Sequence, residues 1–203
     1  MASGLGPTGM QITLTPEVVV PDTSPLIHLA AVGQLPLLNA LGRVVVVDVV
    51  AFEATADLAK PFAPEIGAWI EEGGREGSNL PVRIATTEIG EAYRLARQTD
   101  PGFRLRNGGE QAILSWLADE LPSTQGPALV VYENGRVPRM IRREGLSNVV
   151  VVATTRAILT FAEQQGLIRS AEATWQAIST RAPGANPELQ TRIIRPTRGP
   201  SGS

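Results

Sequence analysis

Short, uninterrupted runs of β-branched residues constrain this chain most, because they alternate with helical patterns along most of its length. The clearest runs are at 18–20, 44–47, 128–132 and 149–153, with a weaker one at 81–85. Strands that are apolar on both faces are typical of a parallel sheet covered by helices on both sides. The sequence therefore predicts an α/β fold, a three-layer α/β/α sandwich with a mainly parallel central sheet.

The first predicted helix begins directly after the first run, where Ser24 is expected to act as its N-cap and Pro25 to lie in its first turn. Further helices are predicted at 35–41, from about 49, and at 65–72, 87–98, 110–121, 136–144, 154–165 and 171–180. A chain of 203 residues suits one domain. We expect a flexible N-terminal segment at 1–15, a domain at 16–181 and a flexible C-terminal tail at 182–203.

Two residue types are nearly missing, and their scarcity excludes several chemistries. The chain has no cysteine, so disulfides, zinc–thiolate sites and thiol catalysis are excluded. Its one histidine, His28, lies on the first apolar helix and is expected to be a packed or surface residue. A His-based triad and a multi-histidine metal site are therefore disfavoured, and any metal site would use oxygen ligands.

The basic residues are almost all arginine, with Lys60 as the exception, although the net charge is only −2. That charge argues against broad nonspecific binding of polyanions. The arginines form two clusters, Arg94, Arg97, Arg104 and Arg106, and then Arg136, Arg139, Arg142 and Arg143. Guanidinium groups suit phosphates and carboxylates equally, so the clusters are compatible with RNA, an acidic partner or plain solvated helix faces.

Nothing in the sequence indicates a membrane protein. The N-terminus lacks the basic start and apolar core of a signal peptide, and no apolar run is long enough to span a bilayer. We therefore expect no membrane partner and a cytoplasmic location.

Acidic residues stand where predicted strands end or helices begin. These candidates are Asp22, Glu53, Glu110 and Glu133. Taken singly, each has an ordinary interpretation as a cap, turn or first-turn residue. At Glu133 the following Asn-Gly is the usual hairpin signal, but Pro138 lies where a return strand would pair, so a strand followed by a helix is favoured.

Taken together, the acids suggest a site, because the carboxyl ends of parallel strands meet at one edge of a sheet, where α/β proteins bind ligands. Clustered carboxylates repel one another unless a cation joins them. Oxygen ligands suit Mg²⁺ or Mn²⁺, and such an ion can activate water and orient a phosphodiester for hydrolysis.

Several segments in the order expected of one family support this interpretation. The segment DTSPLI at 22–27 resembles the opening motif of PIN domains, and VVDVVAFE at 46–53 resembles their second segment. GEQAIL at 109–114 resembles the Gly-Glu helix start of the branch that holds VapC-like toxins and predicted nucleic-acid-binding proteins. The segments VAT at 152–154, LTFA at 159–162 and GLI at 166–168 resemble its closing pattern. The resemblance covers about residues 17–180.

This resemblance implies a metal-dependent endoribonuclease that uses acids to hold Mg²⁺ or Mn²⁺. Many members are toxins that are inhibited by an antitoxin protein, and many form homodimers. The implied catalytic and metal-binding residues are Asp22, Glu53, Glu110 and Glu133, supported by Thr23 or Ser24, by Asn134, and by a hydroxyl from Thr154. Arg136 and Arg139 are the predicted substrate-binding residues.

The chain also departs from the family pattern. Glu133-Asn134 replaces the usual Asp-Asp, Ala153 replaces a Gly, and Pro138 interrupts the following helix. The alternative is therefore a catalytically weakened PIN-like module that binds RNA or protein. A phospho-accepting regulator is disfavoured, because paired acids after the first strand and a lysine after the last are both missing.

Overall fold

A mostly parallel sheet forms the centre of the protein. The computed structural model describes residues 16–123, 126–182, 184–185 and 192–194. The strands are β1 (Val18–Pro21), β2 (Arg43–Val47), β3 (Val82–Ala85), β4 (Ala128–Tyr132), β5 (Val150–Thr154) and β6 (Ile193–Ile194). Their order across the sheet is β3-β2-β1-β4-β5-β6, and only the β5–β6 pair is antiparallel.

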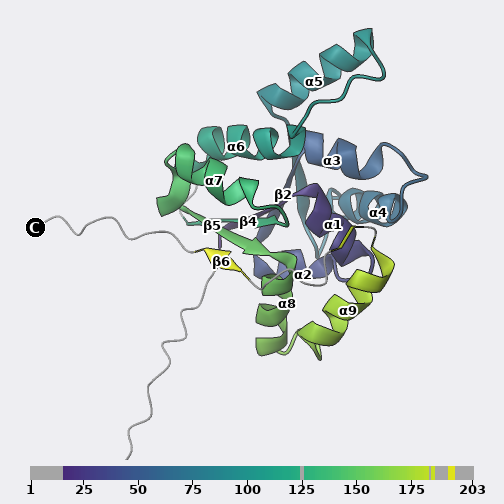
Figure 1. Ribbon diagram of the computed structural model, residues 1–203, viewed down its shortest axis with the longest axis vertical. Coiled ribbons are helices and arrows are strands. Elements are labelled where there is room, and N and C mark those ends of the chain that lie inside the picture. Colours follow the sequence, from purple (N-terminus) through teal and green to yellow (C-terminus); the bar gives the residue numbers. More distant parts are fainter. Residues whose placement is uncertain (1–15, 124–125, 183, 186–191, 195–203) are drawn as a thin grey trace, which may run out of the picture.

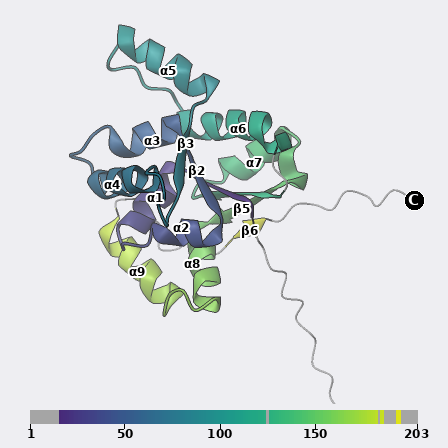
Figure 2. The ribbon, with the colours of Figure 1, turned by 180° about the vertical axis from the view of Figure 1, so that it is seen from behind.

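Helices connect and cover the strands (Figure 1). They are α1 (Thr23–Ala30), α2 (Pro36–Leu41), α3 (Asp48–Thr55), α4 (Ala63–Gly73), α5 (Glu88–Thr99), α6 (Gly108–Glu120), α7 (Arg136–Arg143), α8 (Thr155–Gln164) and α9 (Ala171–Arg181). In both views α6 and α7 lie on one side of the sheet and α2, α8 and α9 on the other, while α5 projects from the body (Figures 1 and 2). The predicted three-layer α/β fold is confirmed.

The strand sequences explain why the sheet is central. Every residue of β1, β4 and β5 is buried, as are the four valines of β2, so these strands are apolar on both faces. The edge strand β3 is buried only at its ends. Continuous valine runs therefore form the middle of the sheet, as expected for strands with helices on both faces.

The topology defines one position on the sheet. The chain passes from β1 outward to β2 and β3, then returns across β1 to add β4 and β5 on the other side. The change of direction falls between β1 and β4, which pair from Val18↔Ala128 to Pro21↔Val131. In open α/β sheets ligands bind beyond the carboxyl ends of the strands at such a switch point.

Two local predictions differ from the structure. Asp22, and not Ser24, is the N-cap of α1, because the Asp22 carboxylate accepts a hydrogen bond from the Thr23 N–H at 2.8 Å. Ser24 lies inside the first turn of the helix. An Asp is as good a cap as a Ser, and the helix begins at Thr23, two residues earlier than a Ser24 cap would allow.

The predicted C-terminal tail contains one short strand. Ile193 and Ile194 form β6, which pairs with Val152 and Ala153 at the sheet edge. A two-residue strand carries no periodicity from which it could be predicted. The predicted flexible segment at 1–15, and most of the rest of the tail, lie outside the described residues.

The remaining boundary predictions are confirmed to within a few residues. At Glu133 the chain continues into α7 and not into a hairpin, and Pro138 is tolerated because it lies in the first turn of that helix. Among the described residues, no helix combines the length and apolar character that crossing a membrane requires.

Candidate functional site

The structure brings the predicted acids to the switch point of the sheet. Asp22 follows β1 and Glu133 follows β4, so they lie on neighbouring central strands. Glu53 lies on α3, and Glu110 lies in the first turn of α6. Electrostatic repulsion from Glu110, Glu53 and Glu133 all acts on Asp22. The four acids therefore share one neighbourhood.

Gly109 shows how closely two of these acids approach. A Cβ atom at this position would lie 3.2 Å from Oε2 of Glu53 and 3.3 Å from Oδ1 of Asp22. Val50 Cγ2 would lie 3.1 Å away. Both carboxylates thus face one point at the start of α6, and the glycine leaves that point open.

Asp22 is the most perturbed of the acids. Asp22 is only 6% exposed, and burial raises the pKa of its carboxyl from 3.8 to about 7. The Thr23 N–H lowers this pKa, and the three neighbouring glutamates raise it. A buried carboxylate surrounded by acids is unfavourable when charged unless a cation compensates it.

Glu53 is held by donors on two sides. The Thr23 hydroxyl donates to Glu53 Oε2 at 2.9 Å, and the Gly109 N–H donates to the same carboxylate. Burial nevertheless raises the pKa of Glu53, and Glu110 raises it further. Thr23 therefore contacts two of the acids: its hydroxyl donates to Glu53 and its backbone N–H donates to Asp22.

Glu110 connects the acid cluster to the start of α7. Asn134 Nδ2 donates to Glu110 Oε1 at 2.9 Å, and Asn134 Oδ1 accepts from the Arg136 N–H at 2.9 Å. The Arg136 guanidinium contacts the Asn107 side-chain oxygen. Asn134, predicted as a supporting residue, thus fixes one oxygen of Glu110.

The Glu133 side chain is 12% exposed and contacts His28. Its Oε1 accepts from the Thr155 N–H at 3.0 Å and lies 3.4 Å from His28 Nδ1. Its Oε2 is buried with no hydrogen-bond partner among the described residues. His28 is buried and packs edge-on against Trp175, with ring centroids 5.8 Å apart. An orphaned carboxylate oxygen is a feature that a bound cation or water would satisfy.

Thr154 is the N-cap of α8, and its predicted support of the acids stays a prediction. Its hydroxyl caps α8 by accepting from the Ala157 N–H at 3.2 Å, and it also accepts from the Arg192 N–H at 3.4 Å. The neighbouring Thr155 N–H is the group that reaches Glu133. Thr154 therefore acts on the site by fixing the start of α8.

Two cations beside the acids were not predicted. A cavity of about 270 Å³ is lined by Glu53 and Thr23 together with Lys60 and Arg104. Lys60 also lowers the pKa of Glu53 electrostatically. The sequence offered two signals, that Lys60 is the only lysine and that Arg104 belongs to the first arginine cluster, but neither placed these residues beside Glu53. Arg136 and Arg139 are exposed on α7, where the Arg139 Nε donates to the Gly135 carbonyl.

The donor set fits a hard divalent cation in its chemistry. Carboxylate oxygens are the ligands that Mg²⁺ and Mn²⁺ prefer, and one buried oxygen, Oε2 of Glu133, has no partner. Within the described ranges, however, no three Asp, Glu or His side chains are already arranged around a single ion position. Each glutamate is instead turned toward its own donor: Thr23 for Glu53, Asn134 for Glu110 and Thr155 for Glu133.

Comparison with known proteins adds no family assignment: no protein-family model matches the chain, and no curated protein sequence matches it significantly.

Proposed function

We propose that the protein is a metal-dependent endoribonuclease that hydrolyses phosphodiester bonds of RNA at the Asp22 cluster. The observation that carries this proposal is the convergence of Asp22 and Glu53 on the open point at Gly109, beside the switch point of the sheet. A buried acid with its pKa raised to about 7 among three further acids is costly to maintain for stability alone.

The proposed roles follow from the contacts. Asp22, Glu53, Glu110 and Glu133 would hold Mg²⁺ or Mn²⁺, which when bound supplies an activated water and neutralises the developing charge on the phosphate. Thr23 and Asn134 orient the carboxylates of Glu53 and Glu110. Lys60 and Arg104, which line the cavity with Glu53, and the exposed Arg136 and Arg139 of α7 offer cations to RNA phosphates.

The resemblance to VapC-like PIN proteins supports the finer part of the proposal, in which the protein is the toxin of a toxin–antitoxin pair. In that case a cognate antitoxin and a homodimer are the expected partners, and the cytoplasm is the expected compartment. Co-expression with the product of the adjacent gene and light scattering of the purified protein test these expectations.

The central experiment is cleavage of a structured RNA such as total tRNA, with Mn²⁺, Mg²⁺ or EDTA. We expect metal-dependent cuts that Asp22→Asn reduces by about a thousandfold, because a metal ion contributes several kcal/mol to such reactions. Asp48→Asn is the matched control, since Asp48 also follows a valine strand but contacts Thr87 outside the cluster. Equal cleavage by the parent and Asp22→Asn would reject the assignment of the metal acids.

The second candidate is a PIN-like module that binds RNA or protein without cutting it. It is favoured by one observation, namely that the three glutamates are turned toward separate donors. If antitoxin-free, metal-loaded protein binds RNA but leaves it intact, this second function replaces the first.

A further inference from the structure

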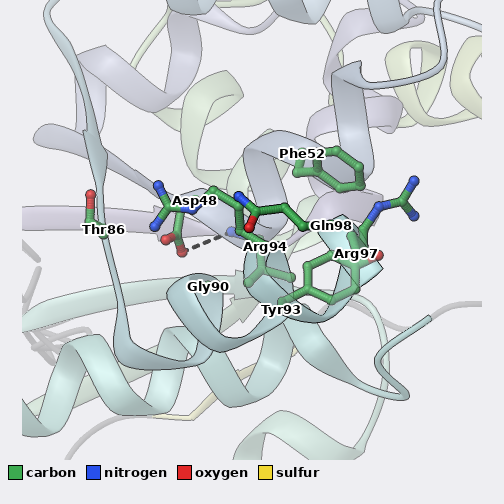
Figure 3. Close-up of a pocket in the computed structure, with 9 residues that line it drawn as sticks. Asp48, Phe52, Thr86, Gly90, Tyr93, Arg94, Arg97 and Gln98 are labelled. Atoms are coloured by element: carbon green, nitrogen blue, oxygen red, sulfur yellow. Dashed lines mark hydrogen bonds between the residues drawn. The ribbon is translucent and has the colours of Figure 1, made fainter. Parts of the chain in front are cut away.

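A second cavity lies next to the acid cluster and has a different character (Figure 3). It has a volume of about 330 Å³, within the range of small-molecule sites. Apolar and aromatic groups form much of its wall, and polar side chains stand around them. The residues that matter here are Phe52, Thr86, Tyr93, Arg94, Arg97 and Gln98.

Its position links it to the proposed active site. Phe52 precedes Glu53 on α3, and Tyr93 lines both this cavity and the one that contains Glu53 and Lys60. Thr86 follows the carboxyl end of β3, so the cavity opens at the same edge of the sheet as the acids. Because Tyr93 is shared, the cavity is a neighbour of the one that contains Glu53.

The wall has the groups that bind planar rings. Phe52 is 38% exposed, which is unusual for a phenylalanine, and its ring meets Tyr93 edge-on at 5.6 Å. The Arg97 guanidinium lies over the Phe52 ring, 4.8 Å from its centroid, and the Arg97 side chain donates to the Phe103 carbonyl at 3.3 Å. Exposed aromatic rings and guanidinium planes are the surfaces on which unpaired RNA bases stack.

We propose that this cavity, called here the Phe52 pocket, binds one unpaired nucleobase of an RNA strand whose phosphate lies at the acid cluster. This inference rests on the proposed function. Phe52 and Arg97 provide the stacking surface, and Thr86 and Gln98 stand where polar groups can meet the edge of the base. The Asp48 carboxylate also lines the wall, but three donors from Val49 and Thr87 already compensate it. Arg94 and Arg97 therefore favour a polyanion over an apolar peptide segment as the occupant.

The test measures binding without cleavage, using short fluorescein-labelled single-stranded RNAs in EDTA. One RNA is intact, and each of the others carries a single abasic nucleotide at a different position. We expect one position at which the abasic nucleotide weakens binding to the parent protein about tenfold, because stacking of one base is worth about that factor. In Phe52→Ala the same substitution should change binding little, since the stacking surface is gone.

Leu95→Ala is the matched control: it removes an exposed apolar side chain from α5 outside the Phe52 pocket. It should bind every RNA as the parent does. The abasic series tests the Phe52 pocket in the parent protein alone, and Arg97→Ala gives a second pocket variant. The proposal can therefore be tested even if Phe52→Ala does not fold.

The outcomes separate the two proposals. If the parent and Phe52→Ala bind intact RNA equally and no abasic position matters, the Phe52 pocket is not a base site, and the nuclease proposal stands. Such a result would favour a protein segment as its occupant. If the parent binds no RNA at all, the proposed function fails, and this inference fails with it.

Discussion

Asp22 and Asp48 come from the same sequence pattern but have opposite surroundings. Each follows a buried valine strand at the carboxyl edge of the sheet, and each stands at the start of a helix. Asp22 follows β1 beside the switch point, whereas Asp48 follows the next strand outward, β2. Their local sequences do not distinguish them, so the difference must come from distant residues.

Asp48 is compensated by donors. Its carboxylate accepts from the Thr87 N–H at 3.0 Å, the Thr87 hydroxyl at 2.9 Å and the Val49 N–H at 2.9 Å. Gly90 allows α5 to pass close by, because a Cβ at that position would lie 2.0 Å from Asp48 Oδ2. Asp48 thus joins the start of α3 to the start of α5, and its role is structural.

Asp22 accepts from the Thr23 N–H and has three other acids around it. The comparison teaches that an acid at a strand end is structural when distant segments bring donors to it, and a candidate functional group when they bring more acids. The predictions below test this distinction.

The largest expected effect is on the pH dependence of stability in EDTA. Because burial raises the pKa of Asp22 to about 7, folded Asp22 holds its proton between about pH 4 and pH 7, where the unfolded chain has lost it. Stability should therefore fall as the pH rises through this window. Asp22→Asn keeps a capping side chain and should be more stable than the parent at about pH 8, by on the order of 4 kcal/mol, with no difference near pH 4.

Urea unfolding of the parent, Asp22→Asn and Asp48→Asn across this pH range measures the effect. Asp48→Asn should retain the slope of the parent, since its Asp22 is intact. If the stabilities of the parent and Asp22→Asn changed with pH in the same way, the pKa of Asp22 would not be raised in the folded protein, and the distinction would fail.

Removing the Asp48 carboxylate should cost about 3 kcal/mol of unfolding free energy, because Asp48→Ala removes hydrogen bonds to a charged acceptor and leaves the Thr87 N–H without it. Chemical denaturation of Asp48→Ala at neutral pH checks this value. Because Asp48 also lines the Phe52 pocket, the assay uses saturating RNA, and the variant should then cleave RNA in proportion to its folded fraction. Loss of cleavage in fully folded Asp48→Ala would place Asp48 in the site and contradict the distinction.

Addition of Mn²⁺ should stabilise the proteins that retain Asp22 more than the variant that lacks it. At a hundredfold excess over its Kd, a ligand that binds only the folded state stabilises it by about 3 kcal/mol. We expect the melting temperature of the parent and of Asp48→Asn to rise with Mn²⁺ at about pH 8, and that of Asp22→Asn to rise much less. An equal rise in all three proteins would locate the metal away from the Asp22 cluster.

The sequence was sufficient for the fold because long-range order here follows from local pattern. Runs such as 44–47 and 128–132 are apolar on both faces, which is typical of strands in a buried parallel sheet. The carboxyl ends of such strands meet at one edge of the sheet. The same logic accounts for Asp22 and Glu133, which follow neighbouring strands, and Glu53 and Glu110 act on Asp22 from α3 and α6. Pro138 was expected to interrupt the helix after Glu133, but α7 begins at Arg136, so Pro138 lies in its first turn, where proline is tolerated.

The details of the site depend on contacts that no local pattern records. Glu133 meets His28 and the Thr155 N–H, and Lys60 stands beside Glu53, because the sheet and its loops bring these residues together. The Phe52 pocket escaped prediction for the same reason, since Phe52 and Tyr93 each fit a helical apolar pattern. The error at Ser24 arose because Ser and Asp cap helices equally well.

The smallest expected effect concerns the two threonines that serve the two acid groups. The Thr23 hydroxyl donates to Glu53 at 2.9 Å, as the Thr87 hydroxyl does to Asp48. Thr87 also caps α5 by accepting from the Gly90 N–H at 2.9 Å. Thr87→Val should therefore cost about 2 kcal/mol of stability, and Thr23→Val only about 1 kcal/mol.

The effect on cleavage should have the opposite order, with Thr23→Val affected more than Thr87→Val. Loss of the Thr23 hydroxyl raises the pKa of Glu53 further, because that hydrogen bond favours the charged carboxylate. Thr23→Val should then require a higher pH and more Mn²⁺ for half-maximal cleavage than the parent, while folded Thr87→Val keeps the values of the parent. If both variants shift metal dependence alike, Thr23 acts through the stability of the domain, and its hydroxyl does not tune Glu53.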